Sequence, residues 1–383
     1  MSKRINKKKL RIFFFIIIII IIMIINYNRF YIFNMPFIED DPLFKSKSYE
    51  LYSNSEKNLI NFIKEEMISD YGGIYTNYLN DKEISNLLEN GRSILSESIG
   101  LILYYYYQES NKEFFDIYVS YVNKYLLTEE GIIYWEINEN GYSNNSSATI
   151  DDLRILRTLI FAYNKWEDSK YLSLYNDMVK ALYYKHTNNG YLINGYDIKY
   201  KEKFNEINIS YIDLYTLNLI SKNNIKFNKI YDNSYKVLKN AYVSDEFPFY
   251  YKYYDFSNEK YSSENNISMI DSLLVVLHLS EIGMNKAETI EWLDQKLLKG
   301  KNIYSEYNIK TTLPTSNIES TAIYAIIARI YKNRKQPEMY KLAIEKMLKF
   351  QIKDRKSVFY GGFADQKKEE AYSFDNLQAL LAL

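Results

Sequence analysis

The chain has 383 residues, of which 47% are hydrophobic, so it can bury a large core in one big domain or two ordinary ones. Its 48 basic and 48 acidic side chains give a formal net charge of zero, which argues against a nucleic-acid partner. Cysteine is absent, and His186 and His278 are the only histidines, so there is little material for a metal centre or a Ser/His/Asp relay. We therefore expect carboxylates to carry any acid–base chemistry, without a metal or cofactor.

The N-terminal segment, residues 1–33, predicts a cytoplasmic tail and a transmembrane anchor. The basic stretch MSKRINKKKLR precedes an unbroken apolar run at residues 12–25. A helix of this run spans about 21 Å, so flanking residues must complete the ~30 Å hydrocarbon core. A cleaved signal peptide is the alternative, but no small-residue cleavage site follows the run. Because the lysines stay inside, we expect the chain beyond a linker at residues 34–52 to lie outside the cell, on a single-pass anchor.

Residues 53–383 predict one domain built from helices, because apolar residues recur with a 3.6-residue period. The pattern gives twelve helices, which begin near Ser55, Ser93, Asn111, Thr149, Ser169, Ile209, Ile225, Ile267, Asn285, Ile318, Lys335 and Ala371. Short turns such as EDS and NRK follow every second helix, and connections of about twenty residues follow the others. This alternation predicts six helical hairpins in series.

The long connections resemble one another, since each has a glycine followed by aromatic or β-branched residues. Examples are YGGIYTNY, EGIIYWEI, NGYLINGY and YGGFADQ. Six repeated hairpins can bury their apolar faces by closing into an all-α ring, the α/α toroid. An open solenoid of helix pairs is the alternative. Long loops on one side favour the toroid, because they can form the walls of a cleft.

The second helix of each hairpin carries an acidic residue near its start. These residues are Glu97, Asp151, Asp152, Asp213, Asp271, Glu319 and Asp375. Helix capping and the helix dipole explain each acid alone, and Glu319 and Asp375 keep that interpretation. A ring would gather the others at one mouth, where like charges separate the pKa values into a protonated acid and an ionised base. Glycosidic bond hydrolysis needs such a pair, and Trp135 and loop tyrosines can stack on sugar rings.

Five segments carry a family resemblance. They are SESIGLILYYYY, GIIYWEI, NSSATIDDLRILRTLIFAYNKW, NISYIDLY and MIDSLLVVLHLSEIG. Together they resemble glycoside hydrolase family 8, over roughly residues 55–383. The resemblance implies an α/α six-hairpin barrel and an inverting enzyme that cuts β-1,4-linked polysaccharides. Membrane-anchored relatives imply exopolysaccharide synthesis or secretion machinery as a further partner.

The resemblance also implies roles for single residues. Glu97 matches the proton donor of the first segment, and Asp271 matches the general base of a subfamily that keeps its base at that position. Asp213 and Asp255 are the alternative bases. We expect burial to raise the pKa of Glu97, and the two catalytic carboxyls to lie ~6.5–9.5 Å apart, with a water between them.

Substrate contacts follow from the same comparison. Trp135 matches the tryptophan that lines the substrate groove, and Tyr211 matches the tyrosine of an N-P-S-Y segment. Asp152 matches the second aspartate of the signature A-T-D-x-D-L and is expected to bind the sugar next to the cleaved bond, with help from Asp151. Ile150 replaces the first aspartate of that signature, and this departure affects the substrate more than the reaction.

Two other functions remain open. Ile150 favours a catalytically inactive protein on the same fold, which would bind a glycan or assist secretion. A polysaccharide lyase or epimerase would need a tyrosine or histidine base and basic groups for uronates. His278 lies well inside its predicted helix and is expected to pack in the core.

Overall fold

The computed structural model describes residues 16–19, 52–78, 92–138, 141 and 143–383. Of the predicted anchor, it describes only residues 16–19, which are helical; the cytoplasmic tail and nearly all of the 34–52 linker lie outside the described residues. Within the described part of the chain, no helix has both the length and the apolar character needed to span a membrane.

Twelve helices of ten or more residues occupy the described part of the chain after residue 52, and each begins within five residues of its predicted start. Their bounds are α2 Ser53–Glu66, α3 Ser96–Gln108, α4 Lys112–Tyr121, α5 Thr149–Trp166, α6 Ser169–Lys185, α7 Leu214–Asn223, α8 Lys226–Asn240, α9 Met269–Glu281, α10 Ala287–Leu298, α11 Thr321–Asn333, α12 Pro337–Met347 and α13 Ser373–Ala382. A π-helical turn, η2 Val122–Leu126, extends α4, and a 3₁₀ turn, η3 Ile209–Tyr211, precedes α7.

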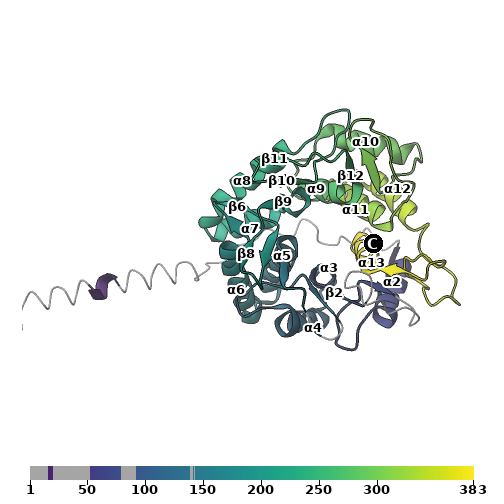
Figure 1. Cartoon of the computed structure of the whole chain (residues 1–383). Coiled ribbons are helices and arrows are strands. Elements are labelled where there is room, and N and C mark those ends of the chain that lie inside the picture. Colours follow the sequence, from purple (N-terminus) through teal and green to yellow (C-terminus); the bar gives the residue numbers. More distant parts are fainter. Residues whose placement is uncertain (1–15, 20–51, 79–91, 139–140, 142) are drawn as a thin grey trace, which may run out of the picture.

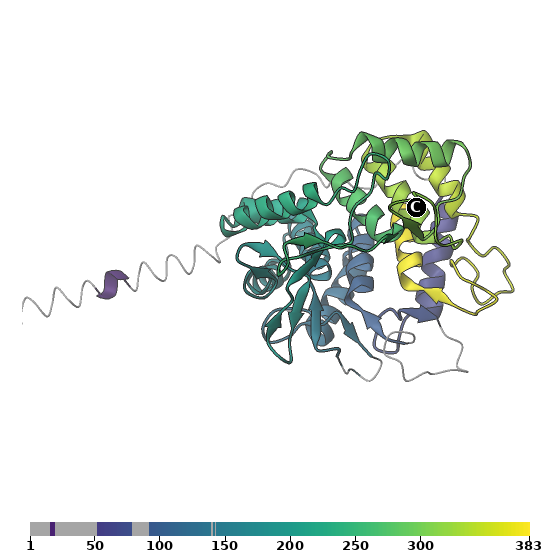
Figure 2. The same ribbon diagram turned by 45° about the horizontal axis from the view of Figure 1, so that its top comes forward.

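The odd-numbered helices from α3 to α13 form a closed inner ring. Each contacts the next one along the chain, and α13 contacts α3 (Figure 1). Helices α2, α4, α6, α8 and α12 pack against the outside of this ring, and α10 packs against α12. Figure 2 shows α2 and α13 side by side, although they lie at opposite ends of the domain sequence. The closure of the ring distinguishes the fold from an open solenoid.

The inner helices are apolar nearly all round because protein surrounds them on every side. In α3 every residue except Glu97 is buried. In α9 all residues except Ile270 and Asp271 are buried. The exceptions lie in the first turn of each helix, so the starts of the inner helices are where the core opens.

Short strands in the long connections are a feature that the helical periodicity did not predict. Their bounds are β1 Asn77–Tyr78, β2 Ile94–Leu95, β3 Glu136–Ile137, β4 Ser146–Ala148, β5 Thr187–Asn188, β6 Tyr191–Leu192, β7 Gly195–Asp197, β8 Glu202–Lys203, β9 Glu206–Asn208, β10 Tyr253–Asp255, β11 Lys260–Tyr261, β12 Asn266–Ser268, β13 Glu306–Asn308 and β14 Ala371–Tyr372. Strands of two or three residues are too short to show a two-residue alternation.

The strands link neighbouring connections around the ring. Strands β2, β4, β9 and β12 lie before α3, α5, α7 and α9, and they pair antiparallel with β3, β7, β10 and β13 of the following connection. Strand β14, before α13, pairs with β1, so that Tyr372 lies opposite Asn77 and the first and last connections are joined. These ladders fix the starts of the inner helices relative to one another.

The glycine that recurs in the long connections lies at a turn in each of them. Gly72, Gly131, Gly190 and Gly361 have φ angles of 87°, 82°, 85° and 85°, a region that residues with a Cβ rarely adopt. At Gly361 a Cβ would also lie 2.5 Å from the backbone oxygen of Asn58. The similarity of the long connections therefore reflects a glycine with positive φ at four turns.

Candidate active site

An open cavity of about 390 Å³ lies at the starts of α3, α5 and α9. Its polar lining consists of Glu97, Asp151, Arg154, Ser210, Tyr211, Ser268 and Asp271. Its apolar lining consists of Leu95, Trp135, Ala148, Ile150, Ile270, Leu274 and Phe374. The structure thus brings together five of the six residues that the sequence nominated; Asp152 is the exception.

Glu97 stands in the first turn of α3, after the extended residue Leu95. Its side chain is 25% exposed, and its Oε2 accepts a hydrogen bond of 3.0 Å from Nη1 of Arg154. Burial raises the pKa of Glu97 to about 6; the charges of Asp151 and Asp271 add to this rise, whereas Arg154 opposes it. A carboxyl facing the cavity is therefore able to hold a proton near pH 6.

Asp151 and Arg154 lie three residues apart in the first turns of α5 and share the same corner of the cavity. Asp151 Oδ1 accepts a hydrogen bond of 2.7 Å from Arg154 Nη1, and its Oδ2 accepts one of 2.8 Å from Ser96 Oγ. Burial raises the pKa of Asp151. Burial alone would lower the pKa of Arg154, but the charges of Glu97 and Asp151 outweigh it and raise that pKa.

Asp271 lies at the start of α9, where Ser268 caps the helix by accepting the Asp271 backbone N–H at 3.2 Å. Burial raises the pKa of Asp271, whereas the Ser268 side chain and the charge of Lys252 oppose that rise. Among the described residues Asp271 forms no ion pair. It faces the same cavity as Glu97 and is close enough for its charge to act on the Glu97 carboxyl.

Neither alternative base faces this cavity. Asp213 caps α7 and binds Nη2 of Arg157 at 2.6 Å in a second, smaller pocket. Asp255 accepts the backbone N–H groups of Ser257 and Asn258 in the turn after β10, and the side-chain hydrogen bond from Asn258 lowers its pKa. Both carboxylates have structural partners that explain their positions.

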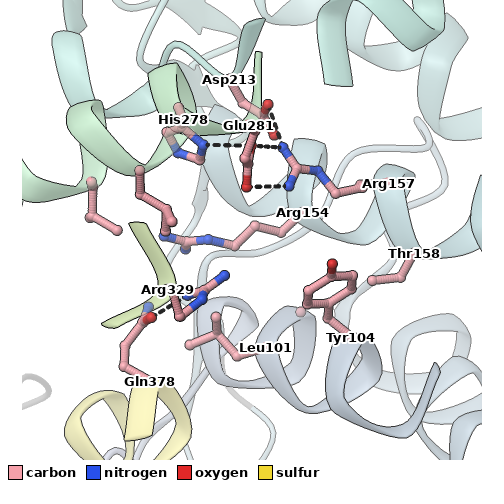
Figure 3. A pocket seen from close by; sticks show the side chains of 13 residues that line it. Leu101, Tyr104, Arg154, Arg157, Thr158, Asp213, His278, Glu281, Arg329 and Gln378 are labelled. Carbon is pink, nitrogen blue, oxygen red and sulfur yellow. Dashed lines mark hydrogen bonds and ion pairs between the residues drawn. The ribbon is translucent and has the colours of Figure 1, made fainter. Parts of the chain in front are cut away.

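The second pocket holds about 40 Å³ and lies next to the cavity, with Arg154 and Leu274 lining both (Figure 3). We give the name deep cluster to five of its lining residues: Arg157, Asp213, His278, Glu281 and Arg329. Glu281 accepts two hydrogen bonds of 2.7 Å from Arg157. Burial would raise the pKa of Glu281, but Arg157 outweighs burial and lowers it. Arg329 donates to Gln378, and burial lowers its pKa to about 10.

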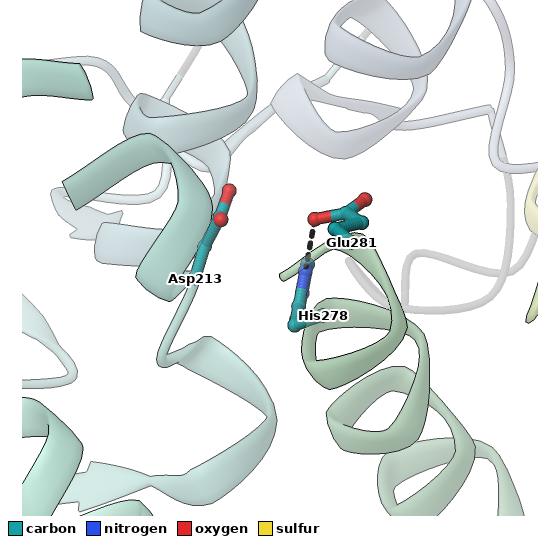
Figure 4. A group of neighbouring side chains, drawn as sticks. All are labelled: Asp213, His278 and Glu281. Carbon is teal, nitrogen blue, oxygen red and sulfur yellow. Dashed lines mark hydrogen bonds and ion pairs between the residues drawn. The ribbon is translucent and has the colours of Figure 1, made fainter. Parts of the chain in front are cut away.

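Three members of the deep cluster have the residue types of metal ligands. One ligand atom each from Asp213, His278 and Glu281 lies within 4.8 Å of the others (Figure 4). Arg157 already forms ion pairs with both carboxylates, so the donor set is that of a buried ion-pair network rather than of a cation site. His278 is buried, as the sequence predicted, and it lies against Glu281 at 3.5 Å.

Asp152 lies behind the cavity wall, fully buried, with Oδ2 at 3.9 Å from Nδ1 of His186. Burial, and then the charge of Asp151, raise its pKa well above the ordinary value. His186 is held by Ser147 Oγ at 2.8 Å and Thr149 Oγ1 at 3.0 Å, and burial lowers its pKa to about 3. Consecutive residues of a helix point about 100° apart, and on α5 Asp151 lines the cavity whereas Asp152 does not.

Arg154 and Arg157 are site residues that the sequence analysis did not predict. Arg154 binds both Glu97 and Asp151, and Arg157 binds Asp213 and Glu281. The spacing of Asp151 and Arg154, three residues apart on one helix, is a favourable spacing for an ion pair and was the available signal. The wall residue Phe374, from α13, had no comparable signal.

Comparisons with known proteins place the chain among carbohydrate-active enzymes. The sequence model described as "Glycosyl hydrolases family 8" matches residues 82–287. A solved structure described as a novel alpha-amylase from Clostridium perfringens is 36% identical, with a TM-score of 0.81 over 86% of this chain and 96% of that chain. A protein of Bacillus subtilis (strain 168) named "Putative lipoprotein YdaJ" is 29% identical over 313 residues, which are 81% of this chain and 84% of that protein.

The fold itself is shared more widely. The structure of endoglucanase Cel10, a family 8 glycosyl hydrolase from Klebsiella pneumoniae, superposes with a TM-score of 0.60 over 84% of this chain and 97% of that chain. Its sequence identity is 15%, so the similarity concerns the fold alone. The predicted helical architecture of this family is thereby confirmed for the described domain.

Proposed function

Because the chain belongs to glycosyl hydrolase family 8, we propose that it cleaves a polysaccharide with inversion of configuration, using Glu97 as general acid and Asp271 as general base. One observation carries the proposal: a single open cavity presents Glu97, whose pKa is raised to about 6, together with Asp271, which forms no ion pair among the described residues. Inverting hydrolysis requires one protonated and one ionised carboxyl on opposite sides of a sugar ring.

The proposed reaction is a single displacement. Glu97 gives its proton to the glycosidic oxygen as the bond from that oxygen to the anomeric carbon breaks. Asp271 takes a proton from a water whose oxygen attacks the anomeric carbon from the opposite face. The two carboxyls should lie ~6.5–9.5 Å apart to leave room for this water. The product is a new reducing end of inverted configuration, and proton exchange with solvent restores both carboxyls.

The cavity also supports assignments for substrate contacts. We assign to Asp151 the sugar contact that the family signature suggested for Asp152, because Asp151 lines the cavity and Asp152 does not. Trp135 and Tyr211 provide an indole and a phenol beside the two carboxyls, and both can lie against sugar faces. Ile150 and Ile270 make one part of the wall apolar.

The linkage has two candidates. The family resemblance favours a β-1,4-linked polysaccharide. The 36% identical structure described as an alpha-amylase favours an α-linked glucan instead. Ile150 stands where the family signature has an aspartate, which changes a hydrogen-bonding position into an apolar one beside the reacting sugar.

A substrate panel with the full chain in detergent tests the proposal. The panel contains β-1,4-glucan, xylan, chitosan, soluble starch and the polysaccharide secreted by the producing cells. We expect new reducing ends from at least one polymer, with the inverted anomer as first product by NMR. Glu97→Gln and Asp271→Asn should each lower kcat by about 10²–10⁴-fold. Near wild-type turnover by either variant would refute the role assigned to that residue.

The same panel tests an inactive glycan-binding protein, the alternative that Ile150 favours. Such a protein would retard the polymer in an affinity gel without shortening it. The two catalytic substitutions would then leave the gel shift unchanged.

We further propose that the domain is held at the outer face of the cell membrane, near the machinery that makes or exports a polysaccharide. The apolar run at residues 12–25 supports the anchor, and a relative is named a lipoprotein. The sequence contains no cysteine, the residue to which thiol-linked lipids attach, so the apolar run itself would provide the attachment. Added protease should remove the domain from intact cells if this placement is correct; a domain that stays protected until the cells are lysed lies inside.

A further inference from the structure

We propose that Arg154 is a positioning residue, which holds the acid Glu97 and the sugar-contacting Asp151 through one guanidinium nitrogen and thereby governs the protonation of Glu97. This inference rests on the proposed function. It concerns a residue that neither the sequence reading nor the family signature singles out.

The contacts form a closed loop between two inner helices. Nη1 of Arg154 lies 3.0 Å from Glu97 Oε2 and 2.7 Å from Asp151 Oδ1. The second oxygen of Asp151 accepts a hydrogen bond from Ser96, the neighbour of Glu97 on α3. Gly100, one turn further along α3, leaves room for the Arg154 stem, because a Cβ there would lie 3.1 Å from the Arg154 Cβ. The arginine therefore fixes the position of the acid relative to α5.

The charge balance around Glu97 depends on the same residue. The titratable groups that act on Glu97 are Arg154 and Asp151 from α5 and Asp271 from α9. Tyr211 from η3 faces the same carboxyls, and burial raises its pKa to about 12, so it is neutral. Arg154 is thus the one cation among the described groups that act on the acid. Without it, Glu97 would have only carboxylates as charged neighbours.

The direction of the effect follows from these signs. The guanidinium favours the ionised form of Glu97, whereas Asp151 favours the protonated form. A general acid works while protonated, so activity falls as pH rises through its pKa. Loss of Arg154 should move this alkaline limb to higher pH. Loss of the Asp151 charge should move it to lower pH.

The test is the pH profile of kcat/KM, measured with the full chain on a polymer that the wild type cleaves. In Arg154→Leu we expect the alkaline limb to rise by about one pH unit, together with a roughly tenfold loss of plateau kcat because the acid is no longer held. Arg154→Lys should restore most of the wild-type limb, since both contacts use one nitrogen. In Asp151→Asn the limb should fall. Arg334→Leu, which removes an arginine outside the cavity, is the control and should leave the limb unchanged.

A purely structural role would lower kcat in Arg154→Leu and Arg154→Lys without moving the limb, and that result overturns the inference. A shift of Arg154→Leu and Asp151→Asn in the same direction also overturns it. The Glu97→Gln variant distinguishes a failure of this inference from a failure of the proposed function. If Glu97→Gln is active, Glu97 is not the general acid. If Arg154→Leu does not fold, Arg154→Lys and Asp151→Asn still test the inference. An alkaline limb that stays in place in Asp151→Asn contradicts the proposed effect of neighbouring charges on the protonation of Glu97.

Discussion

Two groups of acids and arginines lie beside each other in the inner ring, and they differ in how well their charges are matched. In the deep cluster two carboxylates, Asp213 and Glu281, share Arg157, and Arg329 lies near Glu281. In the cavity Glu97 and Asp151 share Arg154, whereas Asp271 forms no ion pair among the described residues. The pKa of Glu281 is lowered, whereas the pKa values of the three cavity carboxyls are raised.

This difference separates carboxylates that stabilise the fold from carboxyls that can exchange a proton. A carboxylate that is fully paired keeps its charge and holds helices together, but it has no proton to give near neutral pH. A carboxyl that is buried and incompletely neutralised can exchange a proton, which costs the folded state free energy above its pKa. Residue types alone do not distinguish the two groups, since both contain Asp, Glu and Arg at the same ring of helices.

The largest effect on stability should come from the deep cluster. Glu281→Gln keeps the shape of the side chain but removes the charge that binds Arg157, and we expect it to lower the free energy of unfolding by about 3–5 kcal/mol. Urea denaturation at pH 7.5 measures this change. An unfolding free energy equal to that of the wild type would mean that the buried pair adds no net stability.

The same substitution in the cavity should have the opposite sign. Burial raises the folded-state pKa of Glu97 to about 6, above its unfolded value near 4.5, so the ionised form destabilises the fold above pH 6. Glu97→Gln should therefore be more stable than the wild type by about 1–2 kcal/mol at pH 7.5. Below pH 4.5 both states hold the proton and the difference should vanish. Denaturation at the two pH values checks this, and a loss of stability like that of Glu281→Gln would erase the contrast between the clusters.

The smallest effect concerns substrate binding, which should depend on the cavity and not on the second pocket, where the deep cluster lies. Trp135→Ala should raise KM about five- to tenfold by removing a flat apolar surface, which corresponds to ~1 kcal/mol. Tyr104→Phe changes an aromatic residue that lines the second pocket and should leave KM unchanged. Equal KM changes in the two variants would indicate that the substrate reaches the second pocket or that both changes distort the ring.

The helical framework was readable from the sequence because its signals are long and regular. Helices such as α5 and α6 extend over many apolar repeats and are separated by a short turn, and their starts at Thr149 and Ser169 were predicted to the residue. The strands were not readable, because ladders such as Asn77 opposite Tyr372 join residues far apart in the chain over only two positions.

The candidate site was readable only in part. The acids Glu97 and Asp271 stood out because each begins an otherwise apolar helix. The choice between Asp151 and Asp152 depended on the rotation of α5 about its axis, which the resemblance to a signature did not fix. The role of Arg154 depended on its pointing into the ring, and a cation on a helix more often points to solvent.

The pairing of β1 with β14 joins residues that are 294 positions apart, through the backbone N–H of Ala371 and the side chain of Asn77. The last inner helix also supplies Phe374 to the cavity wall and packs against α3. In a nascent chain whose α13 is still inside the ribosome, the cavity therefore lacks part of its wall, and the apolar face of α3 that contacts α13 is exposed to solvent. The wall of the cavity is therefore complete only after α13 has packed against α3.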